Sequence, residues 1–236
     1  MKLFRDYAAN ERPQECSGEA EFAVQRVEMI ERQLRRRGVH DSGVLAAMVA
    51  VRREEFVPKE FRQRAYEDAP LPIGEGQTIS QPYIVAAMTV ALRLAGNERV
   101  LEIGTGCGYQ AAILSRLAKI VFTIESRSEL ASSATARLER LGYENVHVHC
   151  GDGTMGLPEL APFDAILVAA GAPAVPEPLR AQLAEGGRMI LPVGDAENQE
   201  LFCLERRGNF FETRTLDACR FVPLIGHHGW KEPPAR

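Results

Sequence analysis

The fold is decided by the stretch Glu98-Arg-Val-Leu-Glu-Ile-Gly-Thr-Gly-Cys-Gly-Tyr-Gln-Ala-Ala-Ile-Leu-Ser-Arg-Leu-Ala-Lys-Ile-Val-Phe-Thr-Ile-Glu125. A short apolar run leads into a turn with glycines at Gly104, Gly106 and Gly108, where missing Cβ atoms let the backbone bend sharply and approach a ligand. The apolar residues after the turn predict a helix, and the β-branched run that follows is typical of an inner parallel strand. The stretch therefore predicts one nucleotide-binding βαβ unit.

The acidic residues of this unit indicate which nucleotide it binds. Glu125 ends the second strand 21 positions after Gly104, where a carboxylate can reach the two hydroxyls of an adenosine ribose. Tyr109 stands where a dinucleotide fingerprint needs glycine, and the charge of Glu102 suits a cationic ligand better than a pyrophosphate. S-adenosylmethionine carries a sulfonium and no phosphate, so it fits better than NAD. An ordinary turn without a ligand stays open at this point.

Composition bounds the class of protein. A chain of 236 residues, 45% hydrophobic and 25% charged, is enough for one α/β catalytic domain. The net charge of -4 argues against a nucleic-acid partner. No apolar stretch is long enough to span a membrane and the first 20 residues are too polar for a signal peptide, so we expect a cytoplasmic protein without a membrane partner. The five cysteines are scattered and the histidines lack acidic companions, so no metal site is expected.

The residues before the unit predict helices and one irregular segment. Residues 1–20 are expected to form a flexible extension, and apolar spacing then predicts two helices. Residues 65–82 hold three prolines and two glycines, and an irregular segment of this length is usually functional. It runs into a helix that starts near Pro82. Ser80 therefore either caps that helix or, with the free amides there, holds a carboxylate.

The residues after the unit predict the rest of the sheet. Three more runs are typical of buried strands: 146–150, 163–170 and 188–193. Asp152 follows the first of them, at the strand end where open α/β sheets bind ligands, and could accept from an adenine amino group. The runs 201–206 and 219–224 predict an antiparallel edge hairpin.

These residues resemble the protein-L-isoaspartate O-methyltransferase family, a branch of the class I S-adenosylmethionine-dependent methyltransferases. The resemblance extends from about Phe22 to Leu224 through Glu54–Pro58, Leu71–Gly74, Gly76–Pro82, Leu101–Gly108, Gly151–Gly153, Phe163–Ile166, Leu191–Gly194 and Arg220–Leu224. It implies a doubly wound, mostly parallel Rossmann-like sheet with helices on both faces and an antiparallel edge hairpin. We expect one domain over residues 21–225 and a separate C-terminal tail over 226–236.

The pattern and the resemblance together imply the site residues. Ser80 is expected to be the active-site residue, and Thr78, Ser80 and Val222 are expected to bind the substrate. Cofactor contacts are expected at Thr78, Ile79, Glu102, Gly104, Thr105, Gly106, Gly108, Glu125, Asp152 and Gly153.

The resemblance also implies the reaction. The methyl group of S-adenosylmethionine would pass to the α-carboxylate of L-isoaspartyl residues in damaged proteins and peptides, leaving S-adenosylhomocysteine, and the protein would be a repair enzyme. Two other hypotheses are a methyltransferase for ordinary Asp carboxylates of one dedicated peptide and a cofactor-binding module without turnover. A nicotinamide oxidoreductase is a more distant alternative.

Overall fold

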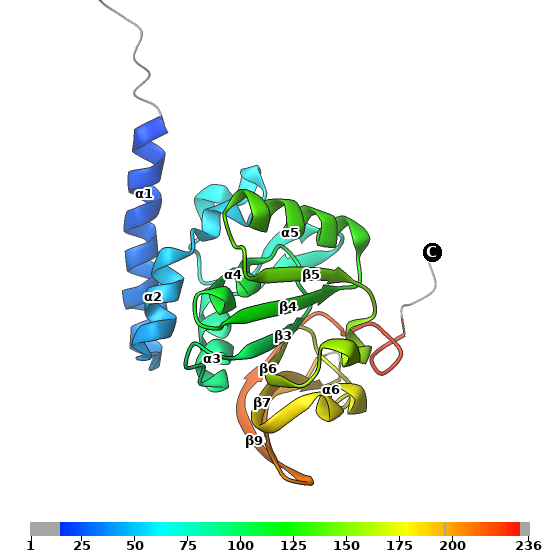
Figure 1. The fold of residues 1–236 in the computed structure, drawn as a ribbon. Helices are drawn as coiled ribbons and strands as arrows, with labels where there is room; N and C mark the ends of the chain where they lie inside the picture. Colours follow the sequence, from blue (N-terminus) through cyan, green and yellow to red (C-terminus); the bar gives the residue numbers. More distant parts are fainter. Residues whose placement is uncertain (1–14, 196, 232–236) are drawn as a thin grey trace, which may run out of the picture.

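The structure is a computed structural model that describes residues 15–195 and 197–231. Within these residues a central sheet contains seven strands: β3 (Arg99–Ile103), β4 (Ile120–Glu125), β5 (Val146–Cys150), β6 (Phe163–Val168), β7 (Leu183–Gly194), β8 (Gln199–Arg207) and β9 (Phe210–Cys219). Their spatial order is β5-β4-β3-β6-β7-β8-β9 (Figure 1). The pairs from β5 to β7 are parallel, and β8 and β9 add antiparallel pairs at the edge. The predicted mostly parallel sheet with an antiparallel edge hairpin is confirmed.

Helices cover both faces of the sheet, as expected. They are α1 (Glu15–Glu28), α2 (Ser42–Ala50), α3 (Pro82–Leu92), α4 (Tyr109–Ser115), α5 (Ser128–Arg140) and α6 (Glu177–Ala181). On one face α3 and α4 pack on alternate residues of the parallel strands, such as Val100 and Leu167. On the other face Leu101 and Ile166 pack against α6 through Leu179. Burial on both faces explains why the inner strands β3, β4 and β6 are mostly apolar, whereas the edge strand β5 is partly exposed and carries two histidines.

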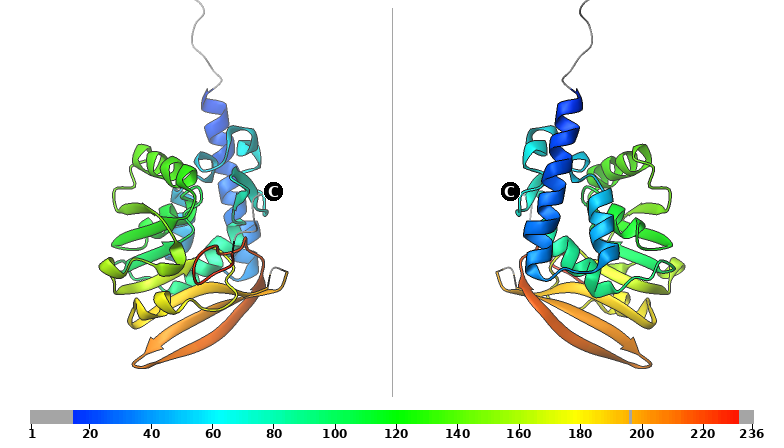
Figure 2. Two further views of the ribbon diagram at one scale, coloured as in Figure 1. Left: turned by 90° about the vertical axis from the view of Figure 1, so that its right-hand side faces the viewer. Right: turned by 90° about the vertical axis from the view of Figure 1, so that its left-hand side faces the viewer.

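The second strand of the edge hairpin differs from its prediction. The sequence predicts 219–224, but β9 spans Phe210–Cys219, paired along its length with β8. Most side chains of β9 are exposed, so the strand lacks the apolar pattern that marks a buried one. Figure 2 shows this hairpin as a twisted ribbon at the edge of the sheet. The apolar residues after Cys219 do not pair as a strand; they lead back toward the centre of the sheet.

Two N-terminal predictions also need correction. Helix α1 begins at Glu15, so residues 15–20 are helical, whereas residues 1–14 lie outside the described part. The segment 65–82 is not wholly irregular, because β1 (Leu71–Gly74) and β2 (Gln77–Ile79) form a small antiparallel sheet. Helix α3 starts at Pro82, as predicted, and this fixes the position of the residues just before it.

Candidate active site

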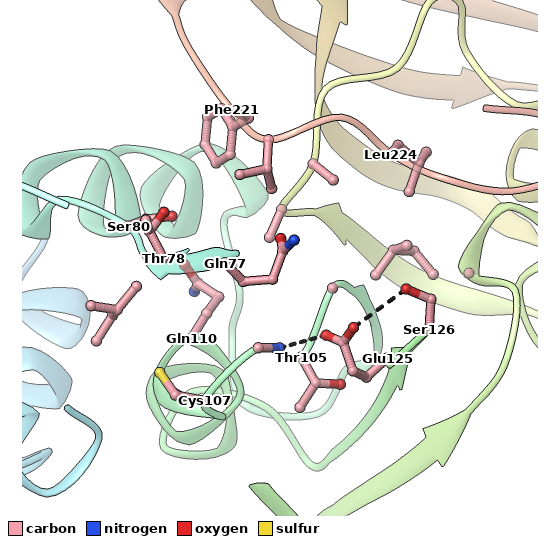
Figure 3. A pocket seen from close by; sticks show the side chains of 18 of the residues that line it. Gln77, Thr78, Ser80, Thr105, Cys107, Gln110, Glu125, Ser126, Phe221 and Leu224 are labelled. Carbon is pink, nitrogen blue, oxygen red and sulfur yellow. Dashed lines mark hydrogen bonds between the residues drawn. The ribbon is translucent and has the colours of Figure 1, made fainter. Parts of the chain in front are cut away.

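A pocket opens at the carboxyl ends of β3, β4 and β6. The strands β4 and β6 lie on opposite sides of β3, which creates the crevice where open α/β sheets bind ligands. The pocket measures about 940 Å³ including its open mouth, which is the size of a small-molecule site. Four segments supply most of its wall: Gln77–Ser80, Ile103–Cys107, Ile124–Arg127 and Phe221–Ile225 (Figure 3).

The glycine turn after β3 forms the floor of this pocket. Gly104 and Gly106 have φ angles of 93° and 52°, in the left-handed region that side chains disfavour. A Cβ on Gly104 would lie 3.6 Å from the Cβ of Ala169, so the turn is already in contact with the end of β6. The backbone of Gly106 remains at the pocket wall, where a ligand can approach it.

Glu125 lies where its side chain reaches across the pocket toward the glycine turn. Its Oε2 accepts from the amide of Gly106 at 2.8 Å, and its Oε1 accepts from the amide of Arg127 at 3.1 Å and the hydroxyl of Ser126 at 3.4 Å. Figure 3 shows the Glu125 carboxylate between the glycine turn and Ser126. A carboxylate has about four lone-pair sites and three are taken, so Oε2 can still accept one hydrogen bond from a ligand.

Glu102 lies inside β3, two residues before Gly104, as predicted, but it does not face the pocket as a cofactor contact should. It is fully buried, and it is not among the residues that line the pocket. Thr123 donates to its Oε2 at 2.5 Å, while its Oε1 has no hydrogen-bond partner among the described residues. Burial raises the pKa of Glu102 to about 8, which keeps the group mostly neutral at pH 7. The expectation that Glu102 presents a negative charge to a cationic ligand is therefore corrected.

Asp152 is also occupied by protein groups. Its Oδ1 accepts from the amide and hydroxyl of Thr154 at 2.9 and 2.7 Å, and its Oδ2 accepts from the amide of His227 at 2.8 Å. Burial opposes ionisation, but these hydrogen bonds outweigh it and hold the pKa of Asp152 below its ordinary value. Gly153 lines the pocket and Asp152 does not.

The described part of the C-terminal tail packs on the domain, contrary to the expected boundary at residue 225. The backbone amide of Trp230 donates to the carbonyl of Leu224 at 2.7 Å, and its indole donates to the carbonyl of Gly171 at 2.9 Å. A Cβ on Gly226 would lie 2.0 Å from Asp152 Oδ1, so only glycine fits there. These contacts hold the wall segment 221–225 against the ends of β5 and β6.

Ser80 lies between β2 and α3, at the rim of the same pocket. The N-cap residue of α3 is Gln81, and no side chain makes a capping hydrogen bond there. The side-chain Nε2 of Gln81 donates instead to the carbonyl of Asp68 at 3.0 Å. The cap interpretation of this segment is therefore wrong. Thr78, Ile79 and Val222, which were also expected in the site, line the pocket with Ser80.

A second cavity, of about 1200 Å³ including its open mouth, adjoins the first. The two share Thr78, Ser80 and the segment 221–223, and the second extends past Tyr83 and Arg220. Ser80 thus lies where a nucleoside-sized pocket meets a groove that can take a chain of residues.

The sequence did not predict one residue that contacts this site, Arg53. It is fully buried, and its Nη2 donates to the carbonyl of Ser80 at 2.7 Å. Arg53 stands in the run Arg52-Arg-Glu-Glu55, which has the composition of a solvated surface. Only the adjoining apolar residues of Phe56–Pro58 could have indicated burial.

Within residues 15–195 and 197–231, no group of three or more His, Cys, Asp and Glu side chains could hold a metal ion. No helix in the same part of the chain is long and apolar enough to cross a bilayer.

A Rossmann-like sheet, a glycine turn and an acidic residue at the end of the next strand define an S-adenosylmethionine-dependent methyltransferase of class I. The chain belongs to the protein-L-isoaspartate(D-aspartate) O-methyltransferase family, whose model matches residues 25–229.

Similar proteins agree with this assignment. A protein-L-isoaspartate O-methyltransferase from Roseiflexus castenholzii is 57% identical over 210 residues, which cover 89% of this chain and 96% of that protein. A solved protein-L-isoaspartate O-methyltransferase superposes with a TM-score of 0.75 at 32% identity, covering 90% of this chain and 67% of that one. A Plasmodium falciparum structure, described as a putative member in complex with S-adenosyl-L-homocysteine, shares the fold, with a TM-score of 0.74 at 24% identity over 86% of this chain and 98% of that one.

Proposed function

We propose that this protein transfers the methyl group of S-adenosylmethionine to the α-carboxylate of L-isoaspartyl residues in damaged proteins and peptides. One observation carries the proposal. Ser80 lies at the junction of a nucleoside-sized pocket and a groove, so a cofactor and a peptide can meet at its hydroxyl. The relatives named for this activity match nearly the whole chain.

The pocket residues fit the cofactor. Glu125 would accept from a ribose hydroxyl with the lone pair of Oε2 that its three protein donors leave free. Gly104 and Gly106 would let the ligand approach the backbone of the turn, and Gly153 would lie on the adenine side. The Plasmodium structure in complex with S-adenosyl-L-homocysteine supports a nucleoside of this kind. When bound, S-adenosylmethionine supplies the sulfonium methyl group.

The carboxylate acceptor needs little acid or base help. A free carboxyl group is ionised at pH 7, so no residue has to remove a proton. A carboxylate oxygen takes the methyl group while the sulfur keeps the electron pair of the broken C–S bond, and the two opposite charges cancel. The chain must therefore align the reactants and exclude water. Ser80 would donate a hydrogen bond to the carboxylate and hold it in line.

The groove would bind the peptide mainly through its backbone. The carbonyl of Val222 is bonded to the amide of Gly171 at 2.8 Å, and both backbone groups of Phe221 are bonded to the side chain of Gln199. A peptide would therefore pair with the backbone groups of this segment that these bonds leave free. Backbone pairing supplies affinity with little reading of neighbouring side chains, as a repair enzyme with many substrates requires.

Paired synthetic peptides that differ only in isoAsp against Asp test the proposal. The isoaspartyl linkage adds a methylene to the main chain, so a normal Asp carboxylate should miss the methyl group by about 1 Å, enough to lower the rate by about 100-fold. We expect transfer to unrelated isoAsp peptides, near silence on their Asp forms, and inhibition by S-adenosylhomocysteine. Comparable rates on both forms would overturn the proposal in favour of an ordinary Asp methyltransferase.

A further inference from the structure

Arg53 is a buried cation with no counter-charge. Its exposed fraction is 0%, and none of its contacts with the described residues is to a carboxylate. Its Nε donates to the carbonyl of Ala65 and its Nη2 to the carbonyl of Ser80, both at 2.7 Å. Its Nη1 has no hydrogen-bond partner in the described part of the chain.

The charged neighbours of Arg53 are committed elsewhere. Glu54, the adjacent acid, pairs with Arg26 at 3.1 Å and accepts from the hydroxyl of Tyr66. Burial lowers the pKa of the Arg53 guanidinium, as expected for a cation that lacks a partner. An unpaired buried charge is strongly unfavourable, and an apolar side chain of similar volume would usually be accommodated better. A structural role alone therefore explains this residue poorly.

Arg53 lies between the helix that follows the glycine turn and the segment that carries Ser80. Its guanidinium lies 4.8 Å from the ring centre of Tyr109, the first residue of α4 directly after the glycine turn. On its other side it holds the carbonyl of Ser80, which precedes the N-cap of α3 and so lies outside the hydrogen bonding of that helix. Arg53 thus contacts the main chain of Ser80, the residue at which the proposed acceptor carboxylate binds.

We propose that Arg53 is a positioning residue for the acceptor: it fixes the main chain of Ser80 and provides the positive potential that draws the isoaspartyl carboxylate into the pocket. This inference rests on the proposed function, because it needs a carboxylate at Ser80. The substrate would supply the missing negative charge. The attraction acts on the bound carboxylate before transfer, so it should appear in KM, whereas the hold on Ser80 should appear in kcat.

Two substitutions separate these contributions. Arg53→Lys keeps the charge but loses the planar guanidinium that bonds the carbonyls of Ala65 and Ser80 at once. The rate constant kcat should therefore fall about 10-fold, while KM for an isoAsp peptide changes little. Arg53→Met removes the charge as well, so KM should also rise by about 10-fold to 100-fold. Arg52→Met is the matched control, because this neighbouring arginine is exposed and pairs with Glu19 at the surface. Its kinetics should equal those of the wild type.

A binding measurement gives a readout independent of turnover. With S-adenosylhomocysteine present, calorimetry compares an isoAsp peptide with the same peptide carrying an α-carboxamide. The wild type and Arg53→Lys should prefer the carboxylate, and Arg53→Met should lose that preference while still binding S-adenosylhomocysteine. If Arg53→Met does not fold, Arg53→Lys decides: wild-type kcat and KM would overturn the inference.

Different results would refute the inference and the proposed function. A wild-type enzyme that methylates no isoAsp peptide refutes the proposed function before any variant is made. An active wild type whose Arg53→Met variant keeps both KM and the carboxylate preference refutes only the role of Arg53. If Arg53→Met loses thermal stability but still prefers the carboxylate peptide over the carboxamide peptide, Arg53 has only a structural role.

Discussion

Replacing Glu102 with glutamine should make the protein less sensitive to alkaline pH. The side chain is fully buried behind the glycine turn, and burial raises its pKa to about 8, from an ordinary value of 4.5. Between these two values the folded protein holds a proton that the unfolded chain releases. The native state is therefore most favoured below pH 4.5, and this contribution is lost as the pH rises toward 8. Glutamine has the same shape and no titration.

The size of the effect follows from the two pKa values. Each pH unit inside the window is worth about 1.4 kcal/mol. The slope is shallower near each pKa, so wild type should lose about 3–4 kcal/mol of unfolding free energy between pH 5 and pH 8 that Glu102→Gln does not lose. The amide leaves one polar atom without a partner, at about 1–3 kcal/mol, but this penalty does not depend on pH. The quantity to measure is therefore how the difference in unfolding free energy between wild type and Glu102→Gln changes with pH.

Denaturant unfolding of both proteins at pH 5, 6.5 and 8 provides that measurement. The stability of the variant relative to wild type should rise steadily across the series. A constant difference at all three values would refute the reasoning, because Glu102 would then be ionised in the folded protein. Calorimetry with S-adenosylhomocysteine adds a second test: we expect near-wild-type affinity, since Glu102 does not line the pocket.

Three further substitutions test the site. Ser80→Ala should keep the fold and cofactor affinity and lower transfer to an isoAsp peptide by about 10-fold to 1,000-fold; unchanged turnover would show that the hydroxyl does not orient the acceptor. Glu125→Ala should weaken S-adenosylhomocysteine binding by about 1.5–3 kcal/mol in calorimetry, and wild-type affinity would remove Glu125 from the ribose. Gly226→Ala should raise peptide KM, because the new Cβ would lie 2.0 Å from Asp152 Oδ1; steady-state kinetics with an unaltered KM would mean that the tail does not hold the substrate wall.

The sequence was most informative where local pattern and burial coincide. The βαβ unit from Glu98 to Glu125 could be predicted because its strands are inner ones, buried on both faces and continuously apolar. The edge strand β9 could not, because its exposed side chains follow no apolar alternation. The run at 219–224 predicts that strand, but Phe221, Val222 and Leu224 are apolar because they form part of the wall of the pocket.

Charged site residues were harder to predict, because a sequence shows the residue type and not its environment. Two acids flank the glycine turn, and the sequence assigned both to a cationic cofactor. In the structure only Glu125 faces the pocket, held by donors from Gly106, Ser126 and Arg127. Glu102 is mostly neutral, first because it is buried and further because the charge of Glu125 is near.

The distribution of charge that results suits the proposed reaction. The cofactor side of the pocket carries one carboxylate, Glu125, and the acceptor side has the buried cation Arg53 behind Ser80. Glu125 would therefore hold the cofactor through its ribose, the acceptor carboxylate would meet the opposite charge of Arg53, and both reactants would be oriented before they react. A second ionised acid at Glu102 would add negative charge near Glu125, and burial prevents that by keeping its proton bound at pH 7. The neutrality of Glu102 and the positive charge of Arg53 would thus both favour the binding of a negatively charged acceptor.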